Sequence, residues 1–461
     1  MIASPSLLTT LFAFLLVLGP LVLIHELGHY LVGRWFGVKA DAFSIGFGKE
    51  IAGWTDKRGT RWKFSALPLG GYVQFAGDLD ATSAPGPLDP DLPEAQRKHT
   101  FQAQPLWRRA LIVLAGPMTN LLFAVLIAAA FYLAYGKSVA EPIVADFFPN
   151  SAAQAAGMQI GDRITAIDGH DVETLTDIPD LVTPYPGQTV TIAYDRDGRT
   201  RKVPVKLGVH QIGDDFGNKA DIGSLGINFA LPVIGKVMDD SPAAAAGVRA
   251  GDRVMAVDKQ TIRSFDQIAA LVTPNPGKRV TLTVMRENGA TLIPLTIGSH
   301  TVELPGGKSK VVGLIGIEAS VGKIVEVGPL EAVGLGFERS IGIMKMMGTG
   351  LVQIITGDRS VKELGGPIKI AQYSGQQFTL GWEDFIGFVA MISINLAFIN
   401  LLPIPGLDGG HLAFYAAEAV RRKPLGVRSQ EWAMRTGVAL VLALMVFVTV
   451  NDVASLPIFG G

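Results

Sequence analysis

The sequence predicts an α-helical polytopic membrane protein with four transmembrane helices and two inserted β-rich domains. Two observations lead to this fold class: four apolar runs are long enough to cross a bilayer, and an internal repeat lies between the second and third of them. The composition agrees, because 48% of the 461 residues are hydrophobic and only 18% are charged. The formal net charge of −1 gives no indication of a nucleic-acid partner.

The first apolar run covers residues 7–32 (LLTTLFAFLLVLGPLVLIHELGHYLV). It lacks the basic start and the small-residue cleavage site of a signal peptide, so we expect it to be retained as a membrane span. The other three expected spans cover residues 108–135, 385–403 and 433–450. A shorter run at 341–355 contains a lysine and a glutamine, and its apolar residues recur at helical spacing, which favours an amphipathic helix at the membrane surface.

The distribution of basic residues predicts the orientation. Lysine and arginine are frequent between the first and second spans and between the third and fourth, whereas the first ten residues and those after 451 contain none. By the positive-inside rule the two basic loops are cytoplasmic, so both termini and the long segment between the second and third spans face the other side. Residues 81–93, rich in proline and acidic side chains, are expected to form a flexible cytoplasmic loop.

The long segment between the second and third spans contains an internal duplication. NSAAQAAGMQIGDRITAIDG (150–169) returns 90 residues later as DSPAAAAGVRAGDRVMAVDK (240–259). This pattern predicts two copies of one small β-rich domain, because the period is too long for a solenoid unit. The predicted domains are 1–136 for the first membrane half, 137–230 and 231–322 for the two copies, 323–383 for a juxtamembrane amphipathic segment, and 384–461 for the second membrane half.

The first span contains a candidate metal site, His25-Glu26-Leu27-Gly28-His29. Two histidines four residues apart lie about 40° apart on one helix face, so both imidazoles can reach one metal ion. Glu26 can accept a proton from an attacking water without filling a coordination position. A chance match to this pattern is common in soluble helices, but ionisable groups in a membrane span are costly and usually functional. We therefore predict that this segment binds a metal.

Asp408 is the candidate for the third metal ligand. The chain contains no cysteine, so nitrogen and oxygen atoms must hold the ion. Asp408 lies in NLLPIPGLDGG (400–410), whose prolines and glycines end the third span in an extended stretch. Because one span separates them, the first and third spans run in the same direction, and both motifs lie near the cytoplasmic side. Ligands of these types could also hold Fe(II), Co(II) or Mn(II).

These features together resemble the site-2 protease family of intramembrane zinc metalloproteases. The resemblance depends mainly on HExxH in the first span and N-x-x-P-x-P-x-L-D-G after the third. It extends nearly from end to end, and the further segments that carry it are 43–48 (FSIGFG), 67–73 (LPLGGYV), 115–120 (AGPMTN) and 364–368 (LGGPI).

The resemblance implies a metal centre with one Zn²⁺ per chain. His25, His29 and Asp408 would bind the ion, and Glu26 would act as general base and acid. These roles agree with the chemistry that the residue types suggest by themselves.

The resemblance also implies a set of substrate-binding residues. Asn400 would contact the substrate backbone near the scissile bond. A membrane-reentrant β-hairpin at 43–75 would pair with an unwound stretch of the substrate helix through Gly46, Phe47 and Gly48. Unwinding is needed because a helical peptide bond is shielded by its own turn.

The two copies resemble bacterial PDZ domains, which carry S-P-A-x-x-A-G followed by G-D. The second copy matches with Ser241-Pro242-Ala243, whereas the first has Ser151-Ala152-Ala153. PDZ domains bind C-terminal peptides at an L-G-ϕ loop, which here ends each copy and suggests a circularly permuted arrangement. Alternatively, the copies act as spacers or as a size gate. The candidates for peptide binding are Leu225, Gly226 and Ile227 in the first copy and Ile315, Gly316 and Ile317 in the second.

The resemblance further implies a reaction and a location. The family cleaves within the transmembrane segment of pre-trimmed single-span membrane proteins, such as the anti-sigma factors of a stress response, and of remnant signal peptides. The partners would be these substrates, the lipid bilayer and C-terminal peptides at the PDZ domains. The expected location is a bacterial inner membrane, with both termini and both PDZ domains on the periplasmic side.

The sequence leaves one alternative of a different class open. The chain could be a non-catalytic membrane adaptor that binds partners through its PDZ domains and holds a purely structural metal. A closed structural site needs a fourth protein ligand, for which His411 is a nearby candidate in the sequence.

Overall fold

The computed structural model describes residues 5–77, 97–213, 219–286, 289–304, 308–320 and 322–454. The expected loop at 81–93 lies outside these residues. The chain forms two compact units. Residues 135–214 and 219–327 make up the repeat unit, and the segments before and after them make up the helical unit.

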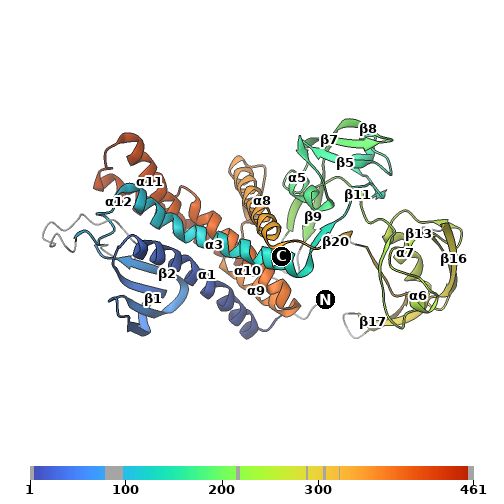
Figure 1. The fold of residues 1–461 in the computed structure, drawn as a ribbon, viewed down its shortest axis with the longest axis horizontal. Helices are drawn as coiled ribbons and strands as arrows, with labels where there is room; N and C mark the ends of the chain where they lie inside the picture. The colour runs from blue at the N-terminus through green and yellow to red at the C-terminus, as the bar shows by residue number, and fades with distance from the viewer. Residues whose placement is uncertain are drawn as a thin grey trace. The chain divides into compact units, whose positions relative to one another are not determined.

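Four long apolar helices form the frame of the helical unit (Figure 1). They are α1 (Leu7–Trp35), α3 (Leu106–Tyr135), α10 (Trp382–Leu401) and α12 (Val427–Ala454). Among the described residues, these four are the helices long and apolar enough to cross a membrane, which confirms the predicted number. Helix α10 ends two residues before the predicted limit, because Leu402 precedes Pro403 and adopts an extended backbone with ψ of 139°.

Three further helices of this unit are α8 (Pro329–Thr356), α9 (Pro367–Leu380) and α11 (Asp408–Arg421). The amphipathic helix expected at 341–355 is the second half of α8. Helix α8 packs closely on α3, because a Cβ atom at Gly336 would lie 2.7 Å from the carbonyl oxygen of Val125. In the same way α9 packs on α1, since a Cβ at Gly375 would lie 2.7 Å from the hydroxyl of Thr10.

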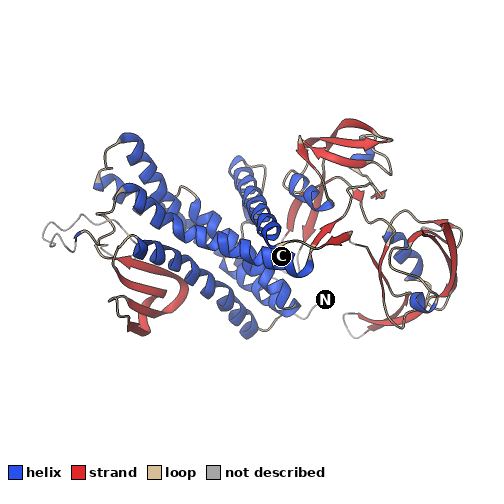
Figure 2. Ribbon diagram, in the orientation of Figure 1, coloured by secondary structure: helices blue, strands red, loops and turns tan. Residues whose placement is uncertain are grey.

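A β-sheet built from one hairpin lies beside α1, and Figure 2 shows it in red next to the helices. The hairpin consists of β1 (Ala40–Thr55) and β2 (Arg61–Phe75) and covers the segment predicted at 43–75. Both strands are long and bend, so that Phe43 is paired with Val73 on one side and with Trp62 on the other. Phe43 is fully buried and packs with Tyr30 of α1, which fixes the sheet against that helix.

The repeat unit contains two four-stranded sheets with the same strand order, which agrees with the predicted duplication. The first sheet has the order β6-β5-β7-β8 and the second has the order β14-β13-β15-β16. The strands of the first are β5 (Arg163–Ile167), β6 (His170–Asp171), β7 (Thr189–Arg196) and β8 (Arg199–Lys206). Those of the second are β13 (Arg253–Val257), β14 (Gln260–Thr261), β15 (Arg279–Arg286) and β16 (Gly289–Thr296).

Each copy continues with a second hairpin and ends with a strand that pairs with its beginning. The hairpins are β9 (Gly208–Gly213) with β10 (Lys219–Ser224) and β17 (Gly298–Leu304) with β18 (Lys308–Leu314). The closing pairs are β11 (Ile227–Asn228) with β4 (Asp146–Phe147) and β19 (Ile317–Ala319) with β12 (Ile234–Val237). At the ends of the unit, β20 (Lys323–Val325) pairs with β3 (Lys137–Val139). The helices of the unit are α4 (Ala152–Ala155), α5 (Ile178–Val182), α6 (Pro242–Ala245) and α7 (Phe265–Val272).

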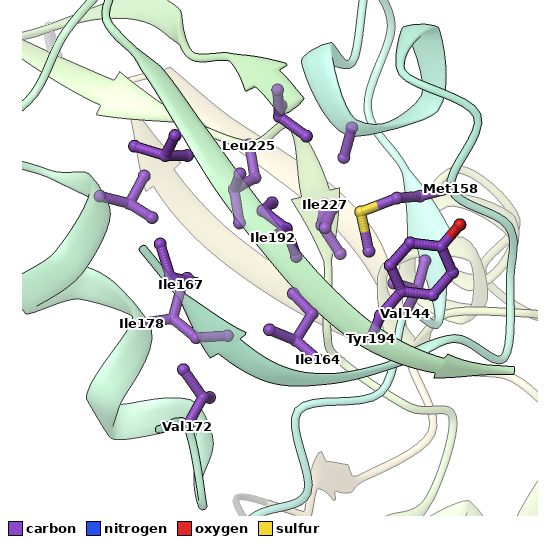
Figure 3. Close-up of a cluster of buried hydrophobic side chains, with 14 of the residues drawn as sticks. Val144, Met158, Ile164, Ile167, Val172, Ile178, Ile192, Tyr194, Leu225 and Ile227 are labelled. Atoms are coloured by element: carbon purple, nitrogen blue, oxygen red, sulfur yellow. The ribbon is translucent and has the colours of Figure 1, made fainter. Parts of the chain in front are cut away.

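The copies are stabilised by aliphatic cores and by a matched pair of buried ion pairs. Figure 3 shows the core of the first copy, where Ile164, Ile192 and Leu225 converge. In this copy Arg196 donates two hydrogen bonds to Asp162, of 2.6 and 2.7 Å. Arg286 and Asp252 repeat this arrangement with the same distances in the second copy.

Candidate metal centre

Three ligand atoms from two helices meet at one point of the helical unit. Helix α1 supplies His25 and His29, and Asp408 is the first residue of α11. The two Nε2 atoms lie 3.2 Å apart, and Oδ2 of Asp408 lies 3.2 Å from His25 Nε2 and 3.5 Å from His29 Nε2. The three side chains are only 12–18% exposed. The structure therefore brings together the three residues that the sequence predicts as metal ligands.

The geometry and the hydrogen bonding of this cluster fit a metal ion. Ligand atoms held about 2.0–2.1 Å from a tetrahedral zinc ion lie about 3.3–3.4 Å from one another, which is close to the observed separations. Oδ2 of Asp408 is buried and accepts no hydrogen bond, although two ring nitrogens are near it. An unsatisfied carboxylate oxygen at this position is explained by a cation that would satisfy it.

The described residues supply three ligands and no fourth. His411 lies one helical turn from Asp408 but is not part of the cluster of His, Cys, Asp or Glu atoms within 4.8 Å of one another. A structural zinc site is closed by four protein ligands, whereas a catalytic site keeps one position open. The observed cluster has the composition of an open site.

Glycines position Asp408 at the start of α11. Gly406 has a φ of +98°, which turns the chain sharply after α10. A Cβ at Gly409 would lie 2.3 Å from the carbonyl oxygen of Leu402, and one at Gly410 would lie 2.3 Å from that of Ile404. The turn can fold back this tightly only because neither residue has a side chain.

Helix α3 forms a second layer behind the two histidines. Nδ1 of His29 lies 2.8 Å from the carbonyl oxygen of Ile112 and can donate to it. Nδ1 of His25 lies 3.5 Å from the side-chain nitrogen of Asn120. At Gly116 a Cβ would lie 2.2 Å from Nε2 of His29, so the rings need a glycine there. The segment 115–120 carries part of the family resemblance, but no local pattern in the sequence indicates that its residues contact the two histidines.

The side chain of Glu26 lies beside the β-sheet. A Cβ at Gly71 of β2 would lie 3.1 Å from Cγ of Glu26, and the backbone N–H of Val73 interacts with its carboxylate. Because β1 lies on the other side of this stretch of β2, residues 71–73 form the side of the sheet that faces α1. The candidate base therefore lies where the metal ligands and the sheet meet.

The predicted substrate-binding residues lie on the same sheet and at the end of α10. Gly46 and Gly48 have positive φ values of +93° and +87°, and Phe47 between them is 40% exposed and stacks on Tyr72 at 6.2 Å. Asn400 lies in the last turn of α10, eight positions before Asp408. Contact of these residues with a substrate remains a prediction.

The candidate peptide-binding loops of the two copies are held by equivalent serines. Gly226 and Gly316 have φ values of +69° and +77°, and a Cβ at either would clash with Ser151 or Ser241, respectively. Ser151 donates a 3.0 Å hydrogen bond to the carbonyl of Leu225. The structure thus places the two triplets in equivalent loops, and peptide binding there remains a prediction.

Comparison with known proteins supports a relation along the whole chain. The model of peptidase family M50 matches residues 13–444. An Agrobacterium fabrum protein named "Putative zinc metalloprotease Atu1380" is 37% identical over 446 residues, which cover 96% of this chain and 95% of that protein. Regulator of sigma-E protease RseP of Escherichia coli is 35% identical over 474 residues, covering 98% of this chain and 100% of that protein.

One solved structure aligns with a part of the chain. The PDZ domain of an SdrC-like protein from Listeria monocytogenes matches 19% of this chain and 90% of that domain, with 23% identity. The TM-score is 0.15, which is too low to support an argument about the fold.

Proposed function

The chain belongs to peptidase family M50 and is a metalloprotease, and from this premise we propose that it cleaves a peptide bond within the transmembrane segment of single-span membrane proteins. One observation carries the proposal: two of the three ligands of an open site lie on an apolar helix of membrane-spanning length, beside a glutamate and a sheet. Water, a metal and an extended peptide can meet at such a site within the depth of a bilayer.

His25, His29 and Asp408 would hold one Zn²⁺. Bound zinc lowers the pKa of water and polarises a carbonyl group. Glu26 would take a proton from the attacking water and return it to the amine that leaves. Glu26 is adjacent to His25 in the chain but is not one of the clustered ligands, so it can accept a proton without occupying a coordination position.

The sheet supplies a way to hold the substrate in an extended form. A transmembrane helix must be unwound before its backbone is open to water. We propose that the unwound stretch lies along the sheet beside Glu26, with Gly46, Phe47 and Gly48 at one end of it and Asn400 contacting the substrate backbone. Backbone pairing of this kind is independent of the substrate's side chains.

The repeat unit would select the substrates. We propose that both copies are circularly permuted PDZ domains, supported by the closing strand of each that pairs with its first strand. They would lie on the periplasmic side of a bacterial inner membrane, as would both termini. There they would exclude substrates with intact outer domains or bind C-terminal peptides through residues 225–227 and 315–317. The substrates would be pre-trimmed proteins of the anti-sigma type and remnant signal peptides.

The decisive experiment measures cleavage in cells of a tagged single-span substrate that lacks its outer domain. Glu26→Gln should retain zinc and lose the cleavage product, because an amide cannot accept the proton. Equal product from wild type and variant, at equal expression, would overturn the proposal and favour the non-catalytic adaptor.

A further inference from the structure

We propose that Asn120 is a positioning residue for the metal centre: its side-chain carbonyl accepts a hydrogen bond from Nδ1 of His25 and so keeps Nε2 of this histidine free for the metal. The inference rests on the proposed function, because it concerns the same metal site. It assigns a role to a residue of α3 that is neither a ligand nor the general base.

A histidine that binds a metal through Nε2 carries its proton on Nδ1, and this proton needs an acceptor. His29 has one in the carbonyl oxygen of Ile112, at 2.8 Å from its Nδ1. For Nδ1 of His25, the hydrogen-bond partner found within the described residues is the amide of Asn120, at 3.5 Å. The two ligands therefore differ: one is oriented by a backbone carbonyl, which no side-chain substitution removes, and the other by a single side chain.

The amide of Asn120 is fully buried, and its two ends are not equally satisfied. The nitrogen Nδ2 faces His25, whereas Oδ1 is buried and has no hydrogen-bond partner in the described structure. A half-turn of the amide exchanges the two atoms without changing the shape of the side chain. With Oδ1 toward His25, the buried acceptor gains a donor and His25 takes the form that binds a metal. The same rotation thus gives Oδ1 of Asn120 a donor and gives the Nδ1 proton of His25 an acceptor.

The backbone around Asn120 is fixed by neighbouring helices, which makes the residue suitable for positioning. The hydroxyl of Ser393 in α10 donates a 2.8 Å hydrogen bond to the carbonyl of Asn120. The hydroxyl of Thr119 donates a 3.0 Å hydrogen bond to the carbonyl of Ile24, the residue before His25. The glycine at 116 lets α3 approach both rings. A side chain whose backbone is held this rigidly can determine the orientation of an imidazole ring.

The test compares Asn120→Asp with Asn120→Leu in the full-length protein in detergent. Both replacements have nearly the size of asparagine, but aspartate can only accept and leucine can do neither. The readouts are the zinc affinity against a graded chelator, the absorption spectrum of the Co(II) form, and the melting temperature. Met118→Leu is the matched control, because Met118 lies on the same helix two positions before Asn120 and its side chain is 41% exposed.

We expect Asn120→Leu to lower the zinc affinity about 10–100-fold, the usual effect of removing a partner of a metal-bound histidine. Asn120→Asp should retain zinc affinity, and Met118→Leu should leave it unchanged. A residue that only fills space would give the opposite order, since leucine would be tolerated better than a buried carboxylate. That order, or unaltered zinc affinity in Asn120→Leu, would overturn the inference. A wild-type protein that binds no zinc would instead contradict the proposed function.

Discussion

The metal centre and the repeats achieve their structures in opposite ways. Around the metal ligands, backbones approach closely at glycines, and a buried carboxylate oxygen of Asp408 has no hydrogen-bond partner. In the repeats, large aliphatic side chains fill the core, and the buried carboxylates of Asp162 and Asp252 are both paired with arginine. The buried carboxylates of the repeats are therefore paired within the chain, whereas the carboxylate of the metal centre is arranged to bind an ion that the chain itself does not supply.

The largest effect should come from removing the unsatisfied carboxylate. Asp408→Ala should lower zinc affinity by more than about 100-fold, beyond the usual cost of losing a second-layer partner, and abolish proteolysis. Metal analysis of the purified full-length protein checks this. His411→Ala is the control and should leave the zinc content unchanged; loss of zinc in that variant would show that the site is closed by a fourth ligand.

The second test concerns the glycine packing behind the ligands. In Gly116→Ala the new methyl group would lie 2.2 Å from Nε2 of His29, so the ring must move and zinc affinity should fall about 10–100-fold. Gly19→Ala in α1 is the matched control, because no described atom outside the neighbouring backbone of its own helix lies within 4 Å of the added Cβ. Zinc titration of both variants measures the difference in affinity. If the two bind zinc equally, the close approach of α3 is not required.

A third prediction addresses the completeness of the repeats. Burial acts to raise the pKa of Asp252, but hydrogen bonds from Arg286 and the backbone outweigh it and keep the pKa below its ordinary value. Asp252→Asn should therefore destabilise the second repeat by about 1–3 kcal/mol at neutral pH, the usual cost of leaving a buried polar group unpaired. Hydrogen exchange of β13–β16 in the full chain measures this loss.

The same pair predicts a pH dependence with a definite sign. Because the folded pKa of Asp252 is lowered, its contribution is complete above the ordinary carboxyl pKa of about 3.9 and disappears as the pH falls through the folded value. The ratio of the hydrogen-exchange rate in the Asp252→Asn variant to the rate in the wild type should thus approach one at acidic pH. A ratio that is independent of pH would contradict a role for the ionised pair.

The smallest effect separates the two repeats from each other. Ser151 and Ser241 cap α4 and α6, and each also hydrogen-bonds to the loop that ends its repeat, at 3.0 Å and 3.5 Å, respectively. Ser151→Ala should cost about 1 kcal/mol, typical of a lost helix cap, and Ser241→Ala somewhat less, because its second bond is long. Hydrogen exchange measured in the hairpins β9–β10 and β17–β18 compares the two losses. A larger effect of Ser241→Ala would contradict this ranking.

The features that sequence reasoning predicted are those with a local or periodic signal. The length of the apolar runs predicted the four helices, and the return of the 150–169 pattern after 90 residues predicted the two copies. The four-residue spacing placed His25 and His29 on one helix face. Asp408 was singled out by the proline- and glycine-rich stretch that ends the third span, and counting the spans placed it at the same membrane depth as the two histidines. The length of α8 was underestimated, because glycines and charged residues interrupt the apolar run in its first half.

The sequence alone determined which elements form and which residue types could bind a metal, because hydrophobic length, helical period and duplication are properties of the chain. Only the tertiary structure decided what surrounds the metal ligands. Gly116, Asn120 and Gly71 act through distances to residues far away in the chain, and no local pattern encodes such distances. The same holds for the pairing of Phe43 with both Val73 and Trp62, since strand register depends on long-range packing. The residue types predicted the chemistry of the site, but the fixed positions of these residues depend on the helices packed around them.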